Sequence, residues 1–270
     1  MKIAALQTVS GTSLQANLER AGALLAQAAG EGAELAVLPE YFCLMGHREH
    51  DKVAVREAFG SGEVQAFLAA QARALGLWIV GGTLPLAADS ELHVRNTSLA
   101  FSPQGECVAR YDKIHLFKFD NGRGEQYDES RVIEAGGAPQ TFMLPSRDGH
   151  TWRVGMSVCY DLRFPELYRA LGADLLLVPS AFTYGTGQAH WELLLRARAV
   201  ENLAYVAAAA QGGRHENGRR TWGQSMVADP WGHVLAQRAD EGEGVVLAQV
   251  DAQRLADVRR QLPALEHRIL

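Results

Sequence analysis

The sequence contains little cysteine and no long run of apolar residues. Its three cysteines, Cys43, Cys107 and Cys159, are odd in number and far apart, so they give no sign of a disulfide framework and fit a reducing cytoplasm. No apolar run approaches the length of a membrane span, and Met1–Gln7 is too short for a signal-peptide core. These absences indicate a cytoplasmic protein with no membrane partner.

The sequence also lacks an excess of positive charge. Its 26 lysines and arginines stand against 31 aspartates and glutamates, and the net charge of −5 disfavours nucleic acid as a partner. The one basic cluster, Arg214–Arg220 (RHENGRR), is short and interrupted by glycine. We therefore interpret it as a surface or lid loop rather than a phosphate-binding patch.

Apolar segments with the character of strands alternate with segments of helical periodicity. Several strand candidates are continuously apolar, which is typical of strands covered on both faces. The alternation predicts an α/β layered fold. The expected strands are Lys2–Gln7, Glu34–Leu38, Leu77–Gly82, Thr97–Ser102, Cys107–Tyr111, Trp152–Val158, Asp174–Val178, Ala204–Ala210, Gln224–Ala228, His233–Gln237 and Val245–Val250, and the expected helices are Leu14–Ala29, Glu63–Leu75, Pro165–Leu171, His190–Asn202 and Asp251–Gln261.

One pattern occurs twice in the chain. Gly32–Phe42 (GAELAVLPEYF) and Gly172–Phe182 (GADLLLVPSAF) each follow a helix and form a strand that ends in proline. Chance similarity between buried strands is the alternative, but the repeat predicts two related halves with their proline-terminated strand ends close together. No linker rich in serine, glycine or proline separates the halves, so we expect a single domain over residues 1–270, with residues 251–270 as an amphipathic C-terminal arm.

Three ionisable residues follow apolar strands. Glu40, Lys113 and Cys159 each come directly after a predicted strand, and ligand sites of open α/β sheets lie beyond the carboxyl ends of strands. Each residue alone has an ordinary explanation as a loop carboxylate, a surface cation or a small core residue. Their shared position predicts a common site.

These residue types suit nucleophilic catalysis. A thiol becomes a strong nucleophile when it loses its proton, and a nearby carboxylate can take that proton and later pass it to a leaving amine. An ammonium group beside the reacting carbonyl stabilises the oxyanion. The set of Glu40, Lys113 and Cys159 therefore indicates attack on a carbonyl or nitrile carbon through a covalent thioester or thioimidate.

The motifs around these residues resemble those of the nitrilase, or carbon–nitrogen hydrolase, superfamily. The matching segments are LPEYF around Glu40, YDKIHLF around Lys113 and CYDLRFPE from Cys159, and the resemblance extends almost end to end. It implies a Glu–Lys–Cys triad on a four-layer α-β-β-α sandwich with two pseudo-symmetric halves. It also implies that Glu129 holds the lysine, that no metal or organic cofactor is needed, and that the chain forms a homodimer or a higher homo-oligomer.

The branch of the superfamily is indicated by the second half. Residues 179–214 and the segment Trp222–Gly232 (WGQSMVADPWG) are similar to amidases acting on deaminated glutathione, and nearly as similar to omega-amidases acting on alpha-ketoglutaramate. Both are metabolite-repair enzymes, and the expected reaction cleaves a linear amide to a carboxylic acid and ammonia. Other amidases, N-carbamoyl hydrolases and nitrilases are the alternatives. The chain departs from these relatives in the loop Lys118–Gln126.

Further residues are candidates for the substrate pocket. Asp161, Arg163 and Glu166 match the family's CYDxRFPE run, and Arg163 is either a ligand for a substrate carboxylate or, as we favour, a structural ion-pair partner. A substrate carboxylate near Thr186 and His190 is physically reasonable because a helix begins there. The predicted substrate-binding set is Tyr41, Tyr160, Arg163, Phe182, Thr186 and His190.

Other classes of protein compete with this interpretation. A Cys–His hydrolase would need His190 or His233 within hydrogen-bonding reach of Cys159. A metal-binding module could use Cys43, His47, His50 and Asp51, although the segment also fits an exposed polar turn. A non-catalytic descendant of the fold is the remaining possibility.

Overall fold

The structure is a computed structural model that describes residues 1–269 except 121, 123 and 125. Its first main sheet has the strand order β17-β1-β2-β3-β5-β4, with β6 also paired to β5. The central strands β1, β2 and β3 are parallel, whereas β17 pairs with β1 in the antiparallel sense. The strands of this sheet are β1 (Lys2–Gln7), β2 (Leu35–Val37), β3 (Trp78–Val80), β4 (Leu84–Ala87), β5 (Val94–Phe101), β6 (Cys107–Asp112) and β17 (Gly244–Gln249).

The second main sheet has the order β16-β15-β12-β11-β10-β9. Its central strands β10, β11 and β12 are again parallel, and antiparallel strands complete both of its sides. The strands are β9 (Gln140–Pro145), β10 (Thr151–Met156), β11 (Leu175–Leu177), β12 (Tyr205–Ala208), β15 (Met226–Ala228) and β16 (Val234–Gln237).

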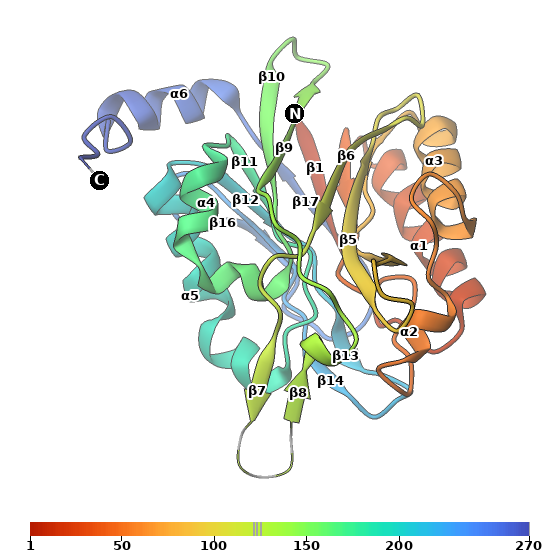
Figure 1. Ribbon diagram of the computed structural model, residues 1–270. Coiled ribbons are helices and arrows are strands. Elements are labelled where there is room, and N and C mark those ends of the chain that lie inside the picture. The colour runs from red at the N-terminus through yellow and green to blue at the C-terminus, as the bar shows by residue number, and fades with distance from the viewer. Residues whose placement is uncertain (121, 123, 125, 270) are drawn as a thin grey trace.

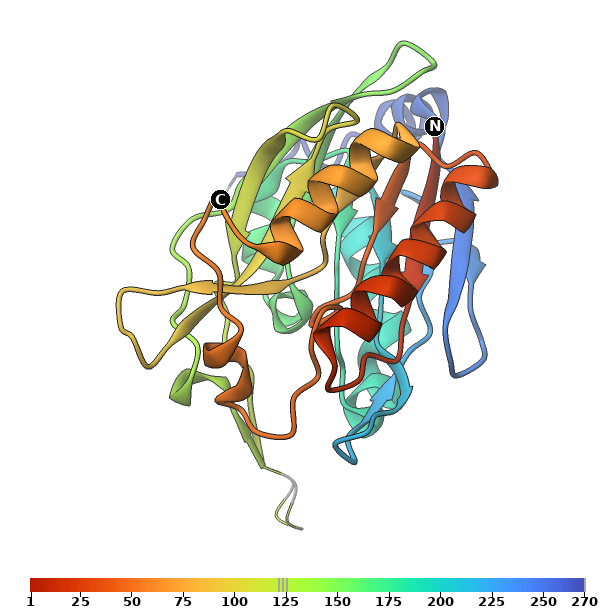
Figure 2. The same cartoon turned by 90° about the vertical axis from the view of Figure 1, so that its right-hand side faces the viewer.

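The two sheets pack face to face between outer layers of helices (Figure 1). Side chains from both sheets share one buried cluster, in which Ile3 and Val37 of the first sheet join Trp152 and Val206 of the second. Helices α1 (Leu14–Gly30) and α3 (Glu63–Leu75) cover the first sheet, and Figure 2 shows them side by side on its outer face. Helices α4 (Pro165–Leu171) and α5 (Tyr184–Asn202) cover the second. The predicted four-layer α-β-β-α sandwich is therefore confirmed.

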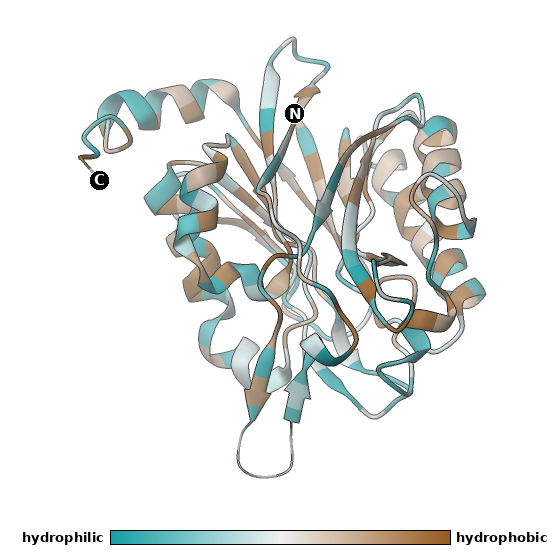
Figure 3. Ribbon diagram, in the orientation of Figure 1, coloured by the Kyte–Doolittle hydropathy of each residue, from teal (hydrophilic) through white to brown (hydrophobic). Residues whose placement is uncertain are grey.

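The helices α1 and α3 are amphipathic, which explains why they form on the outer face of the first sheet. Hydrophilic and apolar residues recur along α1 and α3 (Figure 3), and the apolar ones meet the sheet. The Ser13 side chain caps α1 by accepting a hydrogen bond from the Ala16 N–H. None of the helices in the described part of the chain is both long and apolar enough to cross a membrane.

The repeated sequence pattern occupies equivalent places in the two sheets. β2 and β11 each lie between two parallel neighbours. Beyond β2 the Leu38 N–H donates to the Val80 carbonyl, and beyond β11 the Val178 N–H donates to the Ala207 carbonyl in the same way. The predicted similarity of the two halves is thus confirmed at these strands.

Several elements differ from the predictions. Helix α5 begins at Tyr184 rather than His190, because the glycines of its first turn weaken the helical signal. Gly187 is needed there, since a β-carbon would lie 2.2 Å from the Trp222 side chain. The sequence analysis also missed the strands β4 and β9 and several short elements with few apolar residues, namely α2 (Asp51–Ala54), β7 (Lys118–Asp120), β8 (Gln126–Asp128), β13 (Gly212–Arg214) and β14 (Arg220–Trp222).

Two predicted loops are hairpins. The basic segment Arg214–Arg220 connects β13 to β14, so it belongs to a paired hairpin rather than a free loop. The segment Lys118–Gln126 runs through the antiparallel pair β7–β8, and its residues 121, 123 and 125 lie outside the described part of the chain. Neither hairpin has the apolar alternation that identifies a strand in a sequence.

The C-terminal segment forms the amphipathic helix α6 (Ala252–Gln261). Asp251 caps it by accepting a hydrogen bond from the Gln253 N–H at 2.8 Å, as predicted. Leu255 and Val258 are buried, and Arg259 pairs with Asp174 at 2.6 Å. The helix therefore attaches to the second half of the chain.

Gly82 packs against the segment that follows β2, and its substitution tests whether that close approach requires a glycine. It has a φ of +47°, and a β-carbon would lie 2.0 Å from the Pro39 carbonyl oxygen. We expect Gly82→Ala to lower the free energy of unfolding by more than the roughly 1–2 kcal/mol that a left-handed conformation costs. Gly76→Ala is the matched control, because Gly76 has a φ of +59° but no atom within 4 Å of that β-carbon. Equal losses in urea unfolding would contradict the steric argument.

Candidate active site

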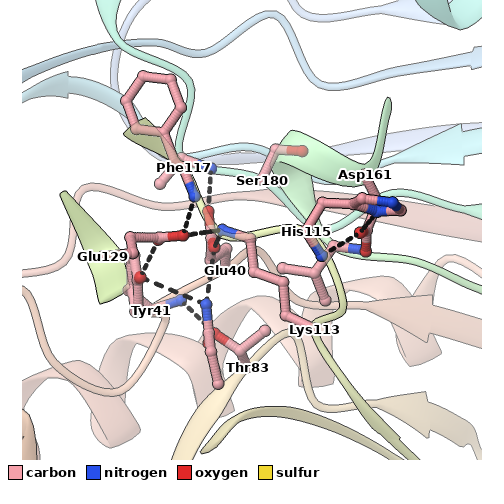
Figure 4. Close-up of polar contacts among 12 residues, drawn as sticks. Glu40, Tyr41, Thr83, Lys113, His115, Phe117, Glu129, Asp161 and Ser180 are labelled. Atoms are coloured by element: carbon pink, nitrogen blue, oxygen red, sulfur yellow. Dashed lines mark hydrogen bonds and ion pairs between the residues drawn. The ribbon is translucent and has the colours of Figure 1, made fainter. Parts of the chain in front are cut away.

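The three strand-end residues meet in one buried cluster. Glu40 follows β2 and Lys113 follows β6, both in the first half, whereas Cys159 follows β10 in the second. The Lys113 ammonium donates to Glu40 Oε1 at 2.8 Å (Figure 4). The side chains of Glu40 and Lys113 are each 1% exposed, and Cys159 is also buried. The predicted convergence of these residues is present in the structure.

The site joins the two halves of the chain. The Ala181 N–H, from the segment after β11, donates to Glu40 Oε2 at 3.0 Å. The proline-terminated strand ends of the two halves therefore lie together, as the repeated pattern predicts.

Lys113 is held between two carboxylates. Besides its bond to Glu40, its Nζ atom lies 2.8 and 3.0 Å from the two oxygens of Glu129. Burial alone would lower the pKa of Lys113, but the charges of Glu129 and Glu40 raise it well above its ordinary value. Lys113 is therefore a fixed cation.

Glu129 lies in a 3₁₀ turn, η1 (Glu129–Arg131), and touches more than the lysine. The Tyr41 hydroxyl donates to its Oε1 at 2.6 Å, and the Phe117 N–H donates to its Oε2 at 2.7 Å. Burial would raise the pKa of Glu129, but Lys113 and these donors lower it. The carboxylate is therefore ionised and immobilised beside Lys113.

Asn96 is a member of the cluster that the sequence analysis missed. Its amide nitrogen donates to Glu40 Oε1 at 2.9 Å and approaches the Tyr41 hydroxyl at 3.3 Å. Asn96 is buried in strand β5, whose sequence VRNTSLAF places it beside Arg95, Thr97 and Ser98, so no local signal distinguishes it from its polar neighbours. With Lys113, it fixes one oxygen of Glu40.

Cys159 occupies a strained turn. It has a φ of +49° and begins the 3₁₀ turn η2 (Cys159–Arg163). Burial raises the pKa of its thiol well above the ordinary value, the charge and hydrogen bond of Glu40 raise it further, and Lys113 opposes this. Cys159 is therefore a neutral thiol with a carboxylate beside it.

Asp161 fixes that turn to the lysine-bearing strand. One oxygen of its carboxylate accepts from the Val158 N–H at 2.8 Å and the Tyr111 hydroxyl at 2.7 Å. The other accepts from the His115 N–H at 3.1 Å. Asp161 is fully buried, so its carboxylate connects the segments that carry Cys159 and Lys113.

A cavity opens at Cys159. Four of the predicted substrate-binding residues line it, namely Tyr160, Arg163, Phe182 and Thr186. Phe117, Ala181 and Thr183, which were not predicted, complete its wall. Two predicted residues lie elsewhere: Tyr41 lines a neighbouring cavity on the Glu129 side, and His190 is exposed on α5.

Arg163 has no ion pair in the described part of the chain. Its guanidinium lies 3.3 Å from His190 Nδ1 and within 5.5 and 5.9 Å of the ring centres of Phe182 and Tyr160. No carboxylate oxygen of a described residue lies within 4.0 Å of its guanidinium nitrogens, so our favoured interpretation of Arg163 as an ion-pair partner is wrong. Arg163 instead presents its charge at the cavity that contains Cys159.

The competing site chemistries are not supported by the geometry. His190 contacts Arg163, and His233 lies 3.4 Å from Asp229 in the turn before β16, so neither is paired with the thiol. The Cys43 thiol is buried and donates toward the Thr83 carbonyl, whereas His47 and His50 are exposed. No cluster suited to a metal ion occurs among the residues that the structure describes.

Comparison with known proteins gives the family. The sequence model of the carbon–nitrogen hydrolase family matches residues 2–260. The chain belongs to the carbon–nitrogen hydrolase family. It is 41% identical to the deaminated glutathione amidase of Synechocystis sp. over 98% of this chain and 97% of that protein. It is 38% identical to omega-amidase NIT2 of Danio rerio over 93% of this chain and 88% of that one.

The solved structures agree with the family. The NitFhit protein of C. elegans superposes with a TM-score of 0.89 and 36% identity, covering 99% of this chain and 65% of that one. The family match and the amidase names of these relatives show that the chain is an amidase of the nitrilase superfamily. Such an enzyme is a hydrolase that acts on carbon–nitrogen bonds other than peptide bonds.

Asn96 can be tested directly. We expect Asn96→Ala to lower kcat/KM about 10- to 100-fold, because small displacements of a catalytic group are costly. Asn202→Ala is the matched control, since Asn202 is also buried and hydrogen-bonded but lies at the end of α5. Steady-state kinetics and thermal unfolding would be measured on both. A folded Asn96→Ala protein with unchanged kcat/KM would contradict the positioning role.

Proposed function

We propose that this carbon–nitrogen hydrolase is a deaminated glutathione amidase that works through a thioester on Cys159. The observation that carries the mechanism is the Lys113 ammonium fixed between Glu40 and Glu129 beside the Cys159 thiol. The substrate is proposed because relatives of that name share 38–41% identity over nearly the whole chain.

In the first step Glu40 takes the thiol proton while the Cys159 sulfur attacks the amide carbon. The proton must leave during attack, because the raised pKa of Cys159 keeps the resting group neutral. The bond from sulfur to carbon forms as the carbonyl π electrons move to oxygen. Lys113 and the backbone N–H of Tyr160 stabilise that oxyanion.

In the second step the carbon–nitrogen bond breaks and Glu40 returns its proton to the leaving nitrogen. Water, deprotonated by the same carboxylate, then attacks the thioester and releases the acid and the free thiol. Glu129 keeps Lys113 in place throughout and makes no bond to the reacting carbon. These steps need only this chain and water.

The two best candidate substrates differ in their leaving groups. Alpha-ketoglutaramate, the omega-amidase substrate and our second candidate, releases ammonia. Glutathione is a tripeptide, so hydrolysis of its deaminated form releases an amine instead. Both carry a carboxylate on the acyl portion, and Arg163 with Thr186, beside Cys159, is our candidate to bind it.

We further propose that the whole of residues 1–270 acts as one catalytic unit. Donors and acceptors from both halves meet at Glu40, which supports this. The free thiols fit a reducing cytoplasm, where the enzyme would serve metabolite repair. Exposed Leu193 and Val200 on α5 and Trp231 near β16 support a homodimer.

Cys159→Ala tests the mechanism. We expect turnover to be lost, because the substitution removes the thiol that attacks the substrate. The unfolding temperature should stay close to that of the wild type, because only one sulfur atom is removed. Cys107→Ala, which removes an exposed thiol, is the control and should retain full activity. Substantial turnover by Cys159→Ala would refute the thioester pathway.

A product screen tests the substrate. We expect deaminated glutathione to give the highest kcat/KM when amine release is measured, with ammonia release from alpha-ketoglutaramate second. N-carbamoyl amino acids, glutamine-like amides and simple nitriles complete the panel. Hydrolysis of nitriles alone would contradict an amidase, and a preference for alpha-ketoglutaramate would favour the second candidate.

The oligomer is tested by light scattering on the purified chain. We expect a mass of twice 29.4 kDa. Leu193→Glu should shift the mass toward the monomer if α5 contributes to the contact, whereas a charge at exposed Leu92, between β4 and β5, should not. A strict wild-type monomer would contradict the dimer.

A further inference from the structure

The basic segment Arg214–Arg220 is anchored to the body of the protein. His215 is buried, with its ring nitrogens 2.9 Å from the Ser10 carbonyl oxygen and 2.8 Å from the Thr221 hydroxyl. The following strand β14 joins the wall of the Cys159 cavity, since the Trp222 N–H donates to the Phe182 carbonyl at 3.0 Å. The hairpin is therefore part of the site's surroundings.

The other polar residues of the turn have partners that hold it in place. Glu216 accepts from the Thr12 N–H at 2.9 Å, and the Asn217 amide donates to the Gly46 carbonyl at 2.7 Å. Arg220 pairs with Glu241 at 3.1 Å through its Nε atom. These contacts fix the hairpin that carries Arg219.

The Arg219 guanidinium has no anionic partner in the described part of the chain. It lies 5.0 Å from the Tyr127 ring centre, and its Nη1 atom lies 3.6 Å from the Met45 sulfur. No Asp or Glu oxygen of a described residue lies within 4.0 Å of it. The Arg219 side chain is partly exposed, and the charge of Glu49 acts on it without an ion pair within 4.0 Å. Its hydrogen-bonding fork is therefore open to an incoming anion.

Arg219 faces a cavity on the Glu129 side of the site. Phe117 lines both this cavity and the one at Cys159, and the other residues of the wall are Tyr41, Glu49, Lys52, Tyr127, Asp128 and Glu129. The two cavities are therefore neighbours that share a wall, with one arginine at each.

The charges around this cavity leave Arg219 free to bind an anion. Lys52 is paired with Glu49 at 2.8 Å, and Glu129 is neutralised by Lys113. Asp128, the third carboxylate of the wall, is paired with Lys118 at 3.3 Å. The neighbouring Tyr41 hydroxyl is committed to Glu129. The N–H groups of the Arg219 guanidinium thus donate to no carboxylate of the described residues.

We propose that Arg219 binds the carboxylate at the leaving-group end of the substrate, while the acyl end lies in the Cys159 cavity. The inference rests on the proposed function, because deaminated glutathione has a carboxylate at each end, one on the acyl portion and one on glycine. The residues Arg163 and Arg219 match these two charges. The fork of a guanidinium suits a carboxylate, which it binds through two parallel hydrogen bonds.

A double-mutant cycle between protein and substrate tests this. Deaminated glutathione is compared with its glycine carboxamide, which keeps the scissile bond but lacks the distal charge. We expect the wild type to prefer the acid about 10- to 100-fold in kcat/KM, mainly through KM. In Arg219→Met this preference should vanish, and Arg219→Lys should restore part of it. Arg214→Met, which removes an exposed cation from the same hairpin, should behave as the wild type.

The outcomes separate this inference from the proposed function. If the wild type hydrolyses both peptides equally, or Arg219→Met loses activity equally on both, Arg219 does not bind the glycine carboxylate and the inference is overturned while the function stands. If the wild type hydrolyses neither, the proposed substrate fails and the inference fails with it. Circular dichroism of each variant checks that the hairpin change has not unfolded the protein.

Discussion

The structure depends on one buried cation, the ammonium group of Lys113. Removing a single partner from a buried ion pair costs about 3–5 kcal/mol, because it leaves an uncompensated charge away from water. Glu40 and Glu129 are those partners, and they come from segments separated in sequence by 73 and 16 residues from the lysine. The charge of Lys113 therefore sets where β2, β6 and the 3₁₀ turn η1 can lie.

A second buried charge, the carboxylate of Asp161, fixes the turn that carries Cys159. The Asp161 carboxylate holds the turn after β10 and reaches Tyr111 of β6. Because β6 also leads into Lys113, the turn that carries Cys159 and the strand that carries the cation share one carboxylate. The two charged centres together determine how the thiol of Cys159, the carboxylate of Glu40 and the ammonium group of Lys113 lie relative to one another.

The sequence predicted the parts of this arrangement that follow from burial and from chain direction. Apolar runs located the central strands, and Glu40, Lys113 and Cys159 stood out because polar residues directly follow those runs. Glu129 came from the family resemblance, since a loop acid has no local signature. Asn96 was missed because its partner, Glu40, lies far from it in the sequence. Arg219 was missed because a sequence does not show that an arginine lacks a carboxylate among its described neighbours.

The hydrogen bond from the Ala181 N–H to Glu40 spans 141 residues of sequence. Closing a loop of this length costs conformational entropy before the contact contributes any stability. We therefore expect the contact to form late in folding. Neither half could therefore complete the hydrogen bonds of Glu40 by itself while the chain is being made. Catalytic activity would report the final docking of the two sheets, so its recovery on refolding should lag behind the formation of helices.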